Sequence, residues 1–164
     1  MPIASSDIKY RLSGGGSNTD PNAALGGAVS STDAASTIFD NVGSAEATAG
    51  DTEYRCVYVK NNHGSLTLTN PKVWIQANTP SGDTSVEISL GTSAVNGTEQ
   101  TITDEDTAPT GTTFVSAANE GAGLSLGDLA PGATKAVWVK RIVSAAAAAA
   151  NDSFTLRVKG DTLP

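Results

Sequence analysis

The stretch from residue 124 to residue 162 constrains the fold more than any other part of the sequence. Six consecutive side chains near its end alternate between apolar and polar, in the order Phe154, Thr155, Leu156, Arg157, Val158, Lys159. A period of two with one apolar face is typical of a strand that is half-buried in an antiparallel sheet. The chain is therefore predicted to end as part of an antiparallel β-sandwich.

Further strand patterns lie upstream, and no helical period separates them. Residues 54–60 are largely apolar on both faces, which predicts a central strand. Shorter patterns predict strands at 73–75, at 86–90 and at 136–140, with a Pro131–Gly132 turn before the last. The alanine run at 145–150 is too short for an isolated helix and predicts a loop tip or a single turn. Seven or eight strands in all predict an all-β, antiparallel β-sandwich.

Three local signals predict how strands begin and end. Asn70–Pro71 is expected to break the strand that opens near Leu68, because proline restricts the residue before it. Asn96–Gly97 predicts a short type I′ hairpin. Residues 113–116 predict a short strand.

The first fifty residues differ in composition from the rest. Ile8, Tyr10 and Leu12 alternate with polar residues, so a short strand is expected at 7–12, but Gly, Ser and Asn then dominate. Two interpretations are open, a flexible tail and an arm that orders against a neighbouring subunit. Scattered apolar residues such as Leu25 and Phe39 favour the arm.

The domain prediction follows from that contrast: an extended N-terminal arm over residues 1–50 and a sandwich domain over residues 51–164. The arm would bind a partner through Ile8, Tyr10, Leu12 and Leu25, with residues 7–12 adding to an exposed sheet edge. Deleting residues 1–30 should then leave a folded domain that no longer joins its partners.

The charge distribution argues against two classes of partner. The net charge is −7, and no run of Lys or Arg exceeds the pair Lys140–Arg141. Nucleic-acid binding needs a basic footprint, so no nucleic-acid partner is expected. No apolar run approaches the roughly 20 residues that span a bilayer, so no membrane partner is expected. No secretory signal is recognisable, so the chain is expected to be synthesised in the cytosol.

The side chains that usually carry chemistry are few. The one histidine, His63, lies in a predicted turn, and the one cysteine, Cys56, lies in an apolar strand. Neither they nor any recognisable motif predicts a catalytic residue, a cofactor or a metal site. The acidic run 104–106 predicts a solvated loop, with calcium as the alternative. Trp74 and Trp138 are expected in core or inter-subunit packing, with a sugar-binding platform as the alternative.

Two segments carry a resemblance to known proteins. LGDLAPGATKAVWVKR and NDSFTLRVKGD, which together cover about the last forty residues, resemble the final strands of bacterial and phage Ig-like domains. With IKYRLSGG and LGGAVSS near the start and DTEYRCVYVKN in the middle, the whole chain is similar to small structural proteins of tailed bacteriophages.

The resemblance implies a non-enzymatic component of a virion, and it transfers no site residue. A capsid decoration (cement) protein, present in many copies or as a homo-oligomer and bound to the major capsid protein, is the expected role. The alternatives are a tail, collar or fibre component, or a carbohydrate- or host-surface-binding module.

Overall fold

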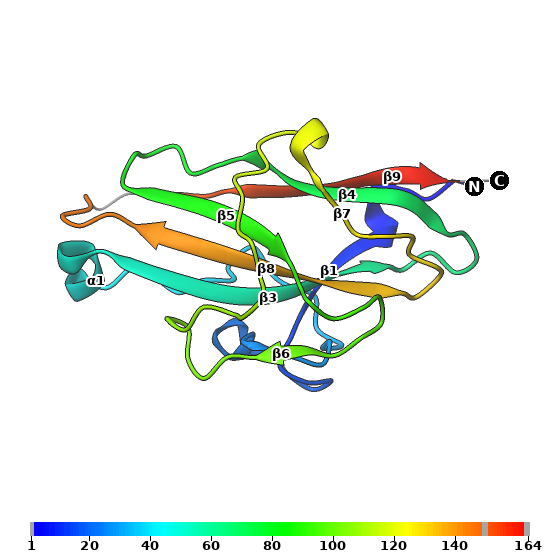
Figure 1. The fold of residues 1–164 in the computed structure, drawn as a ribbon, viewed down its shortest axis with the longest axis horizontal. Coiled ribbons are helices and arrows are strands. Elements are labelled where there is room, and N and C mark those ends of the chain that lie inside the picture. The colour runs from blue at the N-terminus through cyan, green and yellow to red at the C-terminus, as the bar shows by residue number, and fades with distance from the viewer. Residues whose placement is uncertain (1, 149–150, 163–164) are drawn as a thin grey trace.

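Each strand in the structure runs antiparallel to the strands it pairs with. The computed structural model describes residues 2–148 and 151–162, and these residues form an all-β sandwich (Figure 1). One sheet has four strands, in the order β1 (Ile8–Leu12), β3 (Asp51–Asn61), β8 (Thr134–Val143), β5 (Thr84–Leu90). The facing sheet has three strands, in the order β7 (Leu124–Ser125), β4 (Leu68–Ala77), β9 (Thr155–Thr162).

Smaller elements complete the described chain. A two-residue strand β2 (Gly26–Gly27) pairs with β6 (Glu99–Thr101). The α-helix is the six-residue α1 (Ser44–Ala49), and 3-10 turns lie at Ser5–Asp7, Pro21–Ala23 and Glu120–Ala122. The predicted loop at the alanine run is found for residues 145–148, and residues 149–150 lie outside the described part.

The main core fills the space between the two sheets. Its buried members on the four-stranded sheet include Val57, Val59, Val137 and Val139, and those on the facing sheet include Val73 and Ile75. Phe154, Leu156 and Val158 pack against this core as the alternation predicts, but each is only half-buried. The predicted strand at the chain's end and its inward face are therefore confirmed.

A second core covers the other face of the four-stranded sheet. Cys56 and Tyr58 of β3 and Ala136 and Trp138 of β8 alternate with the main-core residues and are all at most 1% exposed. Strands that are apolar on both faces must be covered on both. Residues 13–31 and 91–114 supply that cover, and Figure 1 shows β6 on the side opposite to β4, β7 and β9.

The N-terminal residues are therefore not an extended arm in this structure. β1 pairs with β3 of its own chain over its whole length, from Ile8 opposite Asn61 to Leu12 opposite Val57. Residues 30–34 then run along the other edge of β1, where the amide of Leu12 donates to the carbonyl of Thr32 and that of Ala34 to Tyr10. The short strand expected at 7–12 is confirmed as β1, but it pairs with β3 of its own chain and not with the sheet edge of a neighbour.

Three other expectations are corrected. Asn70–Pro71 does not end a strand: β4 continues through it with a register shift between Thr69 and Lys72, and Asn70 takes a positive φ of 50°. Asn96–Gly97 is a turn with a positive φ at Asn96 but not at Gly97, so it is not type I′, and β6 pairs with distant β2. Residues 113–116 contribute an isolated bridge, Val115 to Ile88, in place of a strand.

Candidate interaction site

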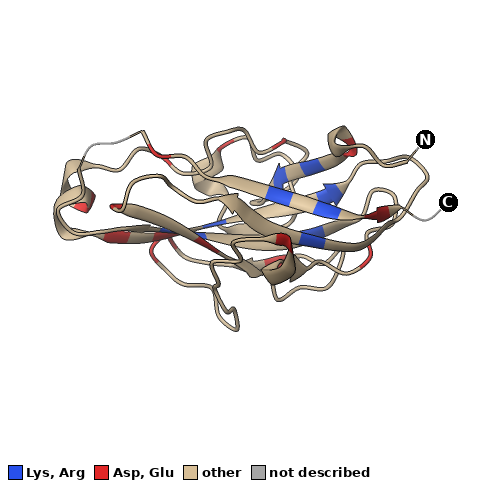
Figure 2. Ribbon diagram, turned by 90° about the horizontal axis from the view of Figure 1, so that it is seen from above, with Lys and Arg blue, Asp and Glu red and all other residues tan. Residues whose placement is uncertain are grey.

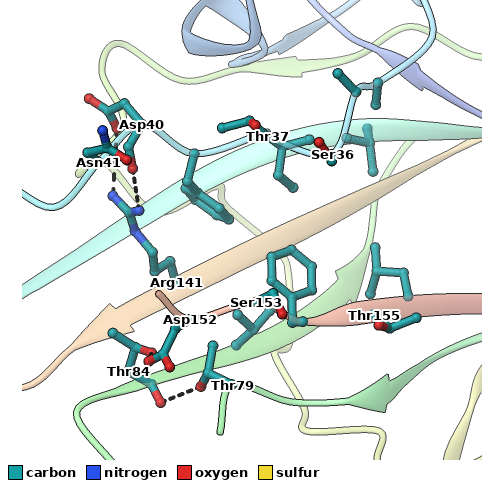
Figure 3. Close-up of a pocket in the computed structure, with 18 of the residues that line it drawn as sticks. Ser36, Thr37, Asp40, Asn41, Thr79, Thr84, Arg141, Asp152, Ser153 and Thr155 are labelled. Atoms are coloured by element: carbon teal, nitrogen blue, oxygen red, sulfur yellow. Dashed lines mark hydrogen bonds and ion pairs between the residues drawn. The ribbon is translucent and has the colours of Figure 1, made fainter. Parts of the chain in front are cut away.

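A cleft of about 480 Å³ opens between the two sheets on the side of β1 and β9. Its walls come from Tyr10 of β1, from Phe154 just before β9, from Leu156 of β9, and from residues 34–42, which run across it (Figure 3). Polar side chains gather at one end, where Asp152 accepts hydrogen bonds from the hydroxyls of Ser81 and Thr84. These bonds lower the pKa of the Asp152 carboxyl.

Phe39 anchors the segment that crosses the cleft. Its ring centroid lies 5.4 Å from the guanidinium carbon of Arg55 and 4.8 Å from that of Arg141. The Phe154 ring meets it edge-on, with centroids 6.5 Å apart. Phe39 is 7% exposed, and cation–π contacts gain strength when they are desolvated in this way.

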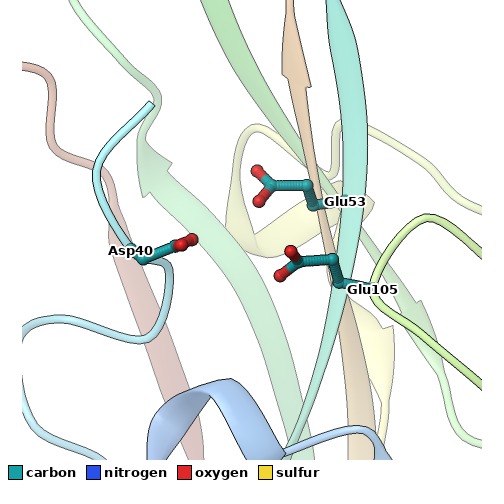
Figure 4. Close-up of side chains that lie close together, drawn as sticks. All are labelled: Asp40, Glu53 and Glu105. Atoms are coloured by element: carbon teal, nitrogen blue, oxygen red, sulfur yellow. The ribbon is translucent and has the colours of Figure 1, made fainter. Parts of the chain in front are cut away.

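Five charged side chains, the charged network hereafter, lie beside Phe39. Three carboxylates, those of Asp40, Glu53 and Glu105, each offer an oxygen within 4.8 Å of the others (Figure 4). Arg55 pairs with Glu105 and, at 3.6 Å, with Asp40. Arg141 pairs with Glu53 and, also at 3.6 Å, with Asp40. A metal ion would face both guanidinium charges here, so the group is an ion network and not a metal centre.

The charged network joins four parts of the chain. Glu53 and Arg141 are cross-strand neighbours on β3 and β8, Asp40 belongs to the segment over the cleft, and Glu105 to the loop after β6. The Arg141 guanidinium also donates to the main-chain carbonyl of Asp40, at 2.6 Å. Burial raises the pKa of Glu53 to about 7, although Arg141 beside it acts in the opposite direction.

A separate group of cations, the basic face hereafter, lies on the outer side of the three-stranded sheet. Lys72 is opposite Lys159, and Trp74 is opposite Arg157. Because Val73 and Val158 pack in the main core, their neighbours Lys72, Arg157 and Lys159 point to the outer side of the sheet. Trp74 is buried and belongs to the main core. The Arg157 guanidinium carbon lies 6.0 Å from the Trp74 ring centroid.

The basic face contrasts with the charge of the whole chain. Lys159 pairs with Glu120 at 3.0 Å, whereas Lys72 and Arg157 have no carboxylate partner among the described residues. Figure 2 shows most of the visible Lys and Arg positions on the half of the molecule where both chain ends lie. An acidic chain thus gathers three cations on the outer side of one sheet, with Glu120 and Asp161 beside them.

The four residues predicted to bind a partner are used within the chain. Leu12 is 1% exposed, Ile8 and Tyr10 pack against the main core, and Leu25 packs against the second core. Burial raises the pKa of the Tyr10 hydroxyl to about 12. Their apolar character was a correct signal of burial, but the surface they cover belongs to their own chain.

The residues that shape the cleft were missed, although the sequence carried a weak signal for two of them. Arg55 lies on the same strand face as Val57 and Val59, where a charge needs a partner. Arg141 follows the alternation of Val137 and Val139 and therefore points inward as well. Nothing local predicted that Asp40 would reach both of them.

The remaining candidates have structural roles. The Cys56 thiol is fully buried, and burial raises its pKa, which disfavours the reactive thiolate. Its role is therefore to pack in the core. The His63 imidazole Nδ1 accepts hydrogen bonds from the amides of Ser65 and Leu66, which stabilises its turn. Trp138 is fully buried and Trp74 is 6% exposed. In the loop 104–106, the two aspartates are exposed and the glutamate pairs with Arg55.

No protein-family model, no curated protein and no solved structure matches this chain. Among the described residues, no helix has the length and apolarity needed to cross a bilayer.

Proposed function

We propose that this chain is a non-enzymatic structural protein of a tailed-bacteriophage particle. Its role would be that of a capsid decoration protein with an Ig-like sandwich, which binds the shell of major capsid proteins and stabilises it. The resemblance of residues 8–31, 51–61 and 126–161 to phage structural proteins supports the particle setting. The geometry of the basic face supports a docking role.

The basic face carries the proposal. Lys72, Arg157 and Lys159 stand on neighbouring strands, so their charges are held at fixed spacing by the sheet. On a chain of net charge −7, such a surface selects acidic partners at short range. Two of the three cations keep their charge free of a carboxylate partner among the described residues, which leaves them available for pairing.

Repetition on a shell would strengthen a modest contact. Three cations make a small docking surface, and exposed ion pairs contribute only about 0.2–1 kcal/mol each. Copies that also contact one another, or that contact two capsomers each, would bind with a far higher avidity than one contact gives. A small domain covered on both faces of its central sheet suits this use, because it loses little conformational entropy on docking.

The alternatives predict different stoichiometries or different surfaces. A tail, collar or fibre component could use the same basic face at few sites on each particle. A carbohydrate-binding module would need exposed aromatic rings, and neither Trp74 nor Trp138 offers one.

The first test is the number of copies of this chain in purified particles relative to the major capsid protein, measured by quantitative mass spectrometry. A number comparable to that of the capsid protein is expected. A far lower number would assign the chain to the tail, collar or fibres, and absence from particles would refute the proposal.

The variant Lys72→Glu tests the basic face itself. It should lower the number of copies in each particle at least about tenfold, because a like-charge contact replaces an attractive one. Lys60→Glu is the matched control, since Lys60 is also a half-buried strand lysine with no carboxylate partner among the described residues. Equal incorporation of the two folded variants would rule out docking by the basic face.

A further inference from the structure

One edge of β9 carries no backbone partner in the described part of the chain. β9 spans Thr155–Thr162 and pairs with β4 along one side. No other backbone–backbone hydrogen bond from residues 154–162 is found. In an antiparallel strand, alternate residues direct their N–H and C=O groups to opposite sides, so half of the strand's residues present theirs at the free edge.

The sheet that contains β9 is one strand narrower than the sheet it faces. Its three strands oppose four, and the cleft of about 480 Å³ lies at the side where a fourth would stand. Leu156 and Val158 of β9 and Ile8 and Tyr10 of β1 pack on the main core but stay half-buried. The cleft lies between Tyr10 and Leu156, reaches Thr84 and Val86 of β5, and is partly filled by residues 34–42. A strand added to β9 would cover apolar surface from both β1 and β9.

The charges on β9 limit which strand could pair there. Arg157 and Lys159 are exposed and lie two residues apart on the outer side of the sheet. In the register centred on Val158, a second β9 running antiparallel would bring Arg157 opposite Lys159, and like charges across strands are destabilising. A shift by two residues would place Asp161 opposite Arg157 but would leave Lys159 opposite its own copy. Cationic side chains on an edge strand thus disfavour self-pairing, whereas acidic side chains at alternate positions would be attracted.

From these observations we infer that the free edge of β9 accepts one extended, acidic strand of a partner protein by β-strand addition. Apolar side chains of that strand lie over the cleft, and its carboxylates face Arg157 and Lys159. This inference rests on the proposed docking function and names the chemistry of the partner, an extended segment in which apolar and acidic residues alternate.

The test uses the full chain and a fluorescent synthetic peptide of sequence Thr-Val-Glu-Val-Glu-Val-Thr, with binding followed by fluorescence anisotropy. Saturable binding with a Kd below about 1 mM is expected. Arg157→Glu should weaken it at least about tenfold, and Lys60→Glu should leave it unchanged. A peptide with lysine in place of both glutamates should bind the double variant Arg157→Glu/Lys159→Glu more tightly than it binds the wild-type chain.

Methylation of the peptide's backbone nitrogens distinguishes strand addition from simple charge attraction. Two peptides are compared, one methylated at alternate residues and one at the residues between them. Strand addition predicts that one pattern abolishes binding and the other preserves it, because alternate amides face β9. Equal binding of the two, or no binding of the unmodified peptide up to 1 mM, would overturn the inference.

The outcome is separable from the test of the proposed function. Loss of particle copies in Lys72→Glu without peptide binding would refute strand addition and leave the docking role supported. Peptide binding by a chain that is absent from particles would refute the virion role and leave the strand-accepting edge supported.

Discussion

Charged side chains occupy inward positions on two central strands of this protein, and they find partners only through the fold. Arg55 is fully buried and Glu53 is 1% exposed. An unpaired buried charge would cost several kcal/mol, so each must meet an opposite charge. The cross-strand register brings Glu53 to Arg141, while Asp40 and Glu105 reach Arg55 from outside the sheet.

Glu53 should make the protein less stable as pH rises from about 4.5 to 7. Burial raises the pKa of Glu53 from its ordinary value of 4.5 to about 7 in the folded chain, so the folded state binds the extra proton in that interval. The free energy of unfolding should therefore fall with rising pH, by about 1–3 kcal/mol in total. Glu53→Gln should flatten this fall in urea titrations at a series of pH values. An unchanged slope would contradict the assignment.

Glu99 should act in the opposite direction at lower pH. Burial alone would raise its pKa, but hydrogen bonds from Ser93 and Thr92 outweigh burial and lower the pKa to about 2. Stability from this group is complete above about 4.5 and is lost as pH falls towards 2. Glu99→Gln should remove this loss of stability at low pH and should lower the free energy of unfolding at pH 7 by about 2 kcal/mol. Glu120→Gln, at an exposed position, is the control and should leave the loss of stability at low pH unchanged.

At the scale of elements, the segment over the cleft differs from the strands around it. Residues 35–42 take part in no backbone–backbone hydrogen bond found among the described residues, and side chains hold them in place. By contrast, β3 and β8 pair over ten residue positions. Regions that depend on a few side-chain contacts open locally more easily than paired strands do.

Phe39→Ala should therefore release this segment. The change removes a buried ring and two cation–π contacts, so a loss of about 3 kcal/mol in the free energy of unfolding is expected. Hydrogen exchange measured by mass spectrometry should rise in the peptide that contains residues 35–42 and stay unchanged in β8. Val42→Ala, a truncation in the same segment at a half-buried position, should have a much smaller effect. Equal effects would show that Phe39 is not the anchor.

The elements that the sequence predicted well are those with a local repeat. The patterns of β3, β5, β8 and β9 each identified a strand, and that of β9 also identified its inward face, because the period of two is a property of the strand itself. The errors fell on β4, on β6 and on residues 113–116, where an isolated bridge takes the place of a strand. β4 absorbs Pro71 with a register shift, and β6 has a pairing partner more than seventy residues away, which no short-range turn signal could reveal.

Across the whole molecule, the N-terminal third works as a layer of the domain. Residues 13–31 cover Cys56, Tyr58, Ala136 and Trp138 on the outer side of the four-stranded sheet, with Leu25 and Val29 as contacts. The amide of Cys56 even donates to the carbonyl of Ala24, at 2.8 Å, on the part of β3 that β1 leaves free. The domain boundary expected near residue 50 thus crosses a continuous core.

Deletion of residues 1–30 should now unfold the protein instead of leaving a stable sandwich. It removes β1 and uncovers the second core, including Trp138. The expected results are loss of soluble yield, or binding of a hydrophobic dye together with a lost unfolding transition. Removal of residues 1–2 is the control and should be tolerated. A truncated chain that is folded and cooperative would restore the arm interpretation.

The sequence by itself determined that this chain is an all-β protein, which strands are central and which of their side chains point inward. These are consequences of a local period, and the apolar faces that it creates must be buried somewhere. Only the tertiary structure decided what buries them: residues 13–31 and 91–114 on one face of β3 and β8, and the three-stranded sheet on the other. It alone brought Asp40, Glu53 and Arg141 together and left one edge of β9 unpaired, because such contacts join residues far apart in the chain and depend on register, which no local pattern encodes.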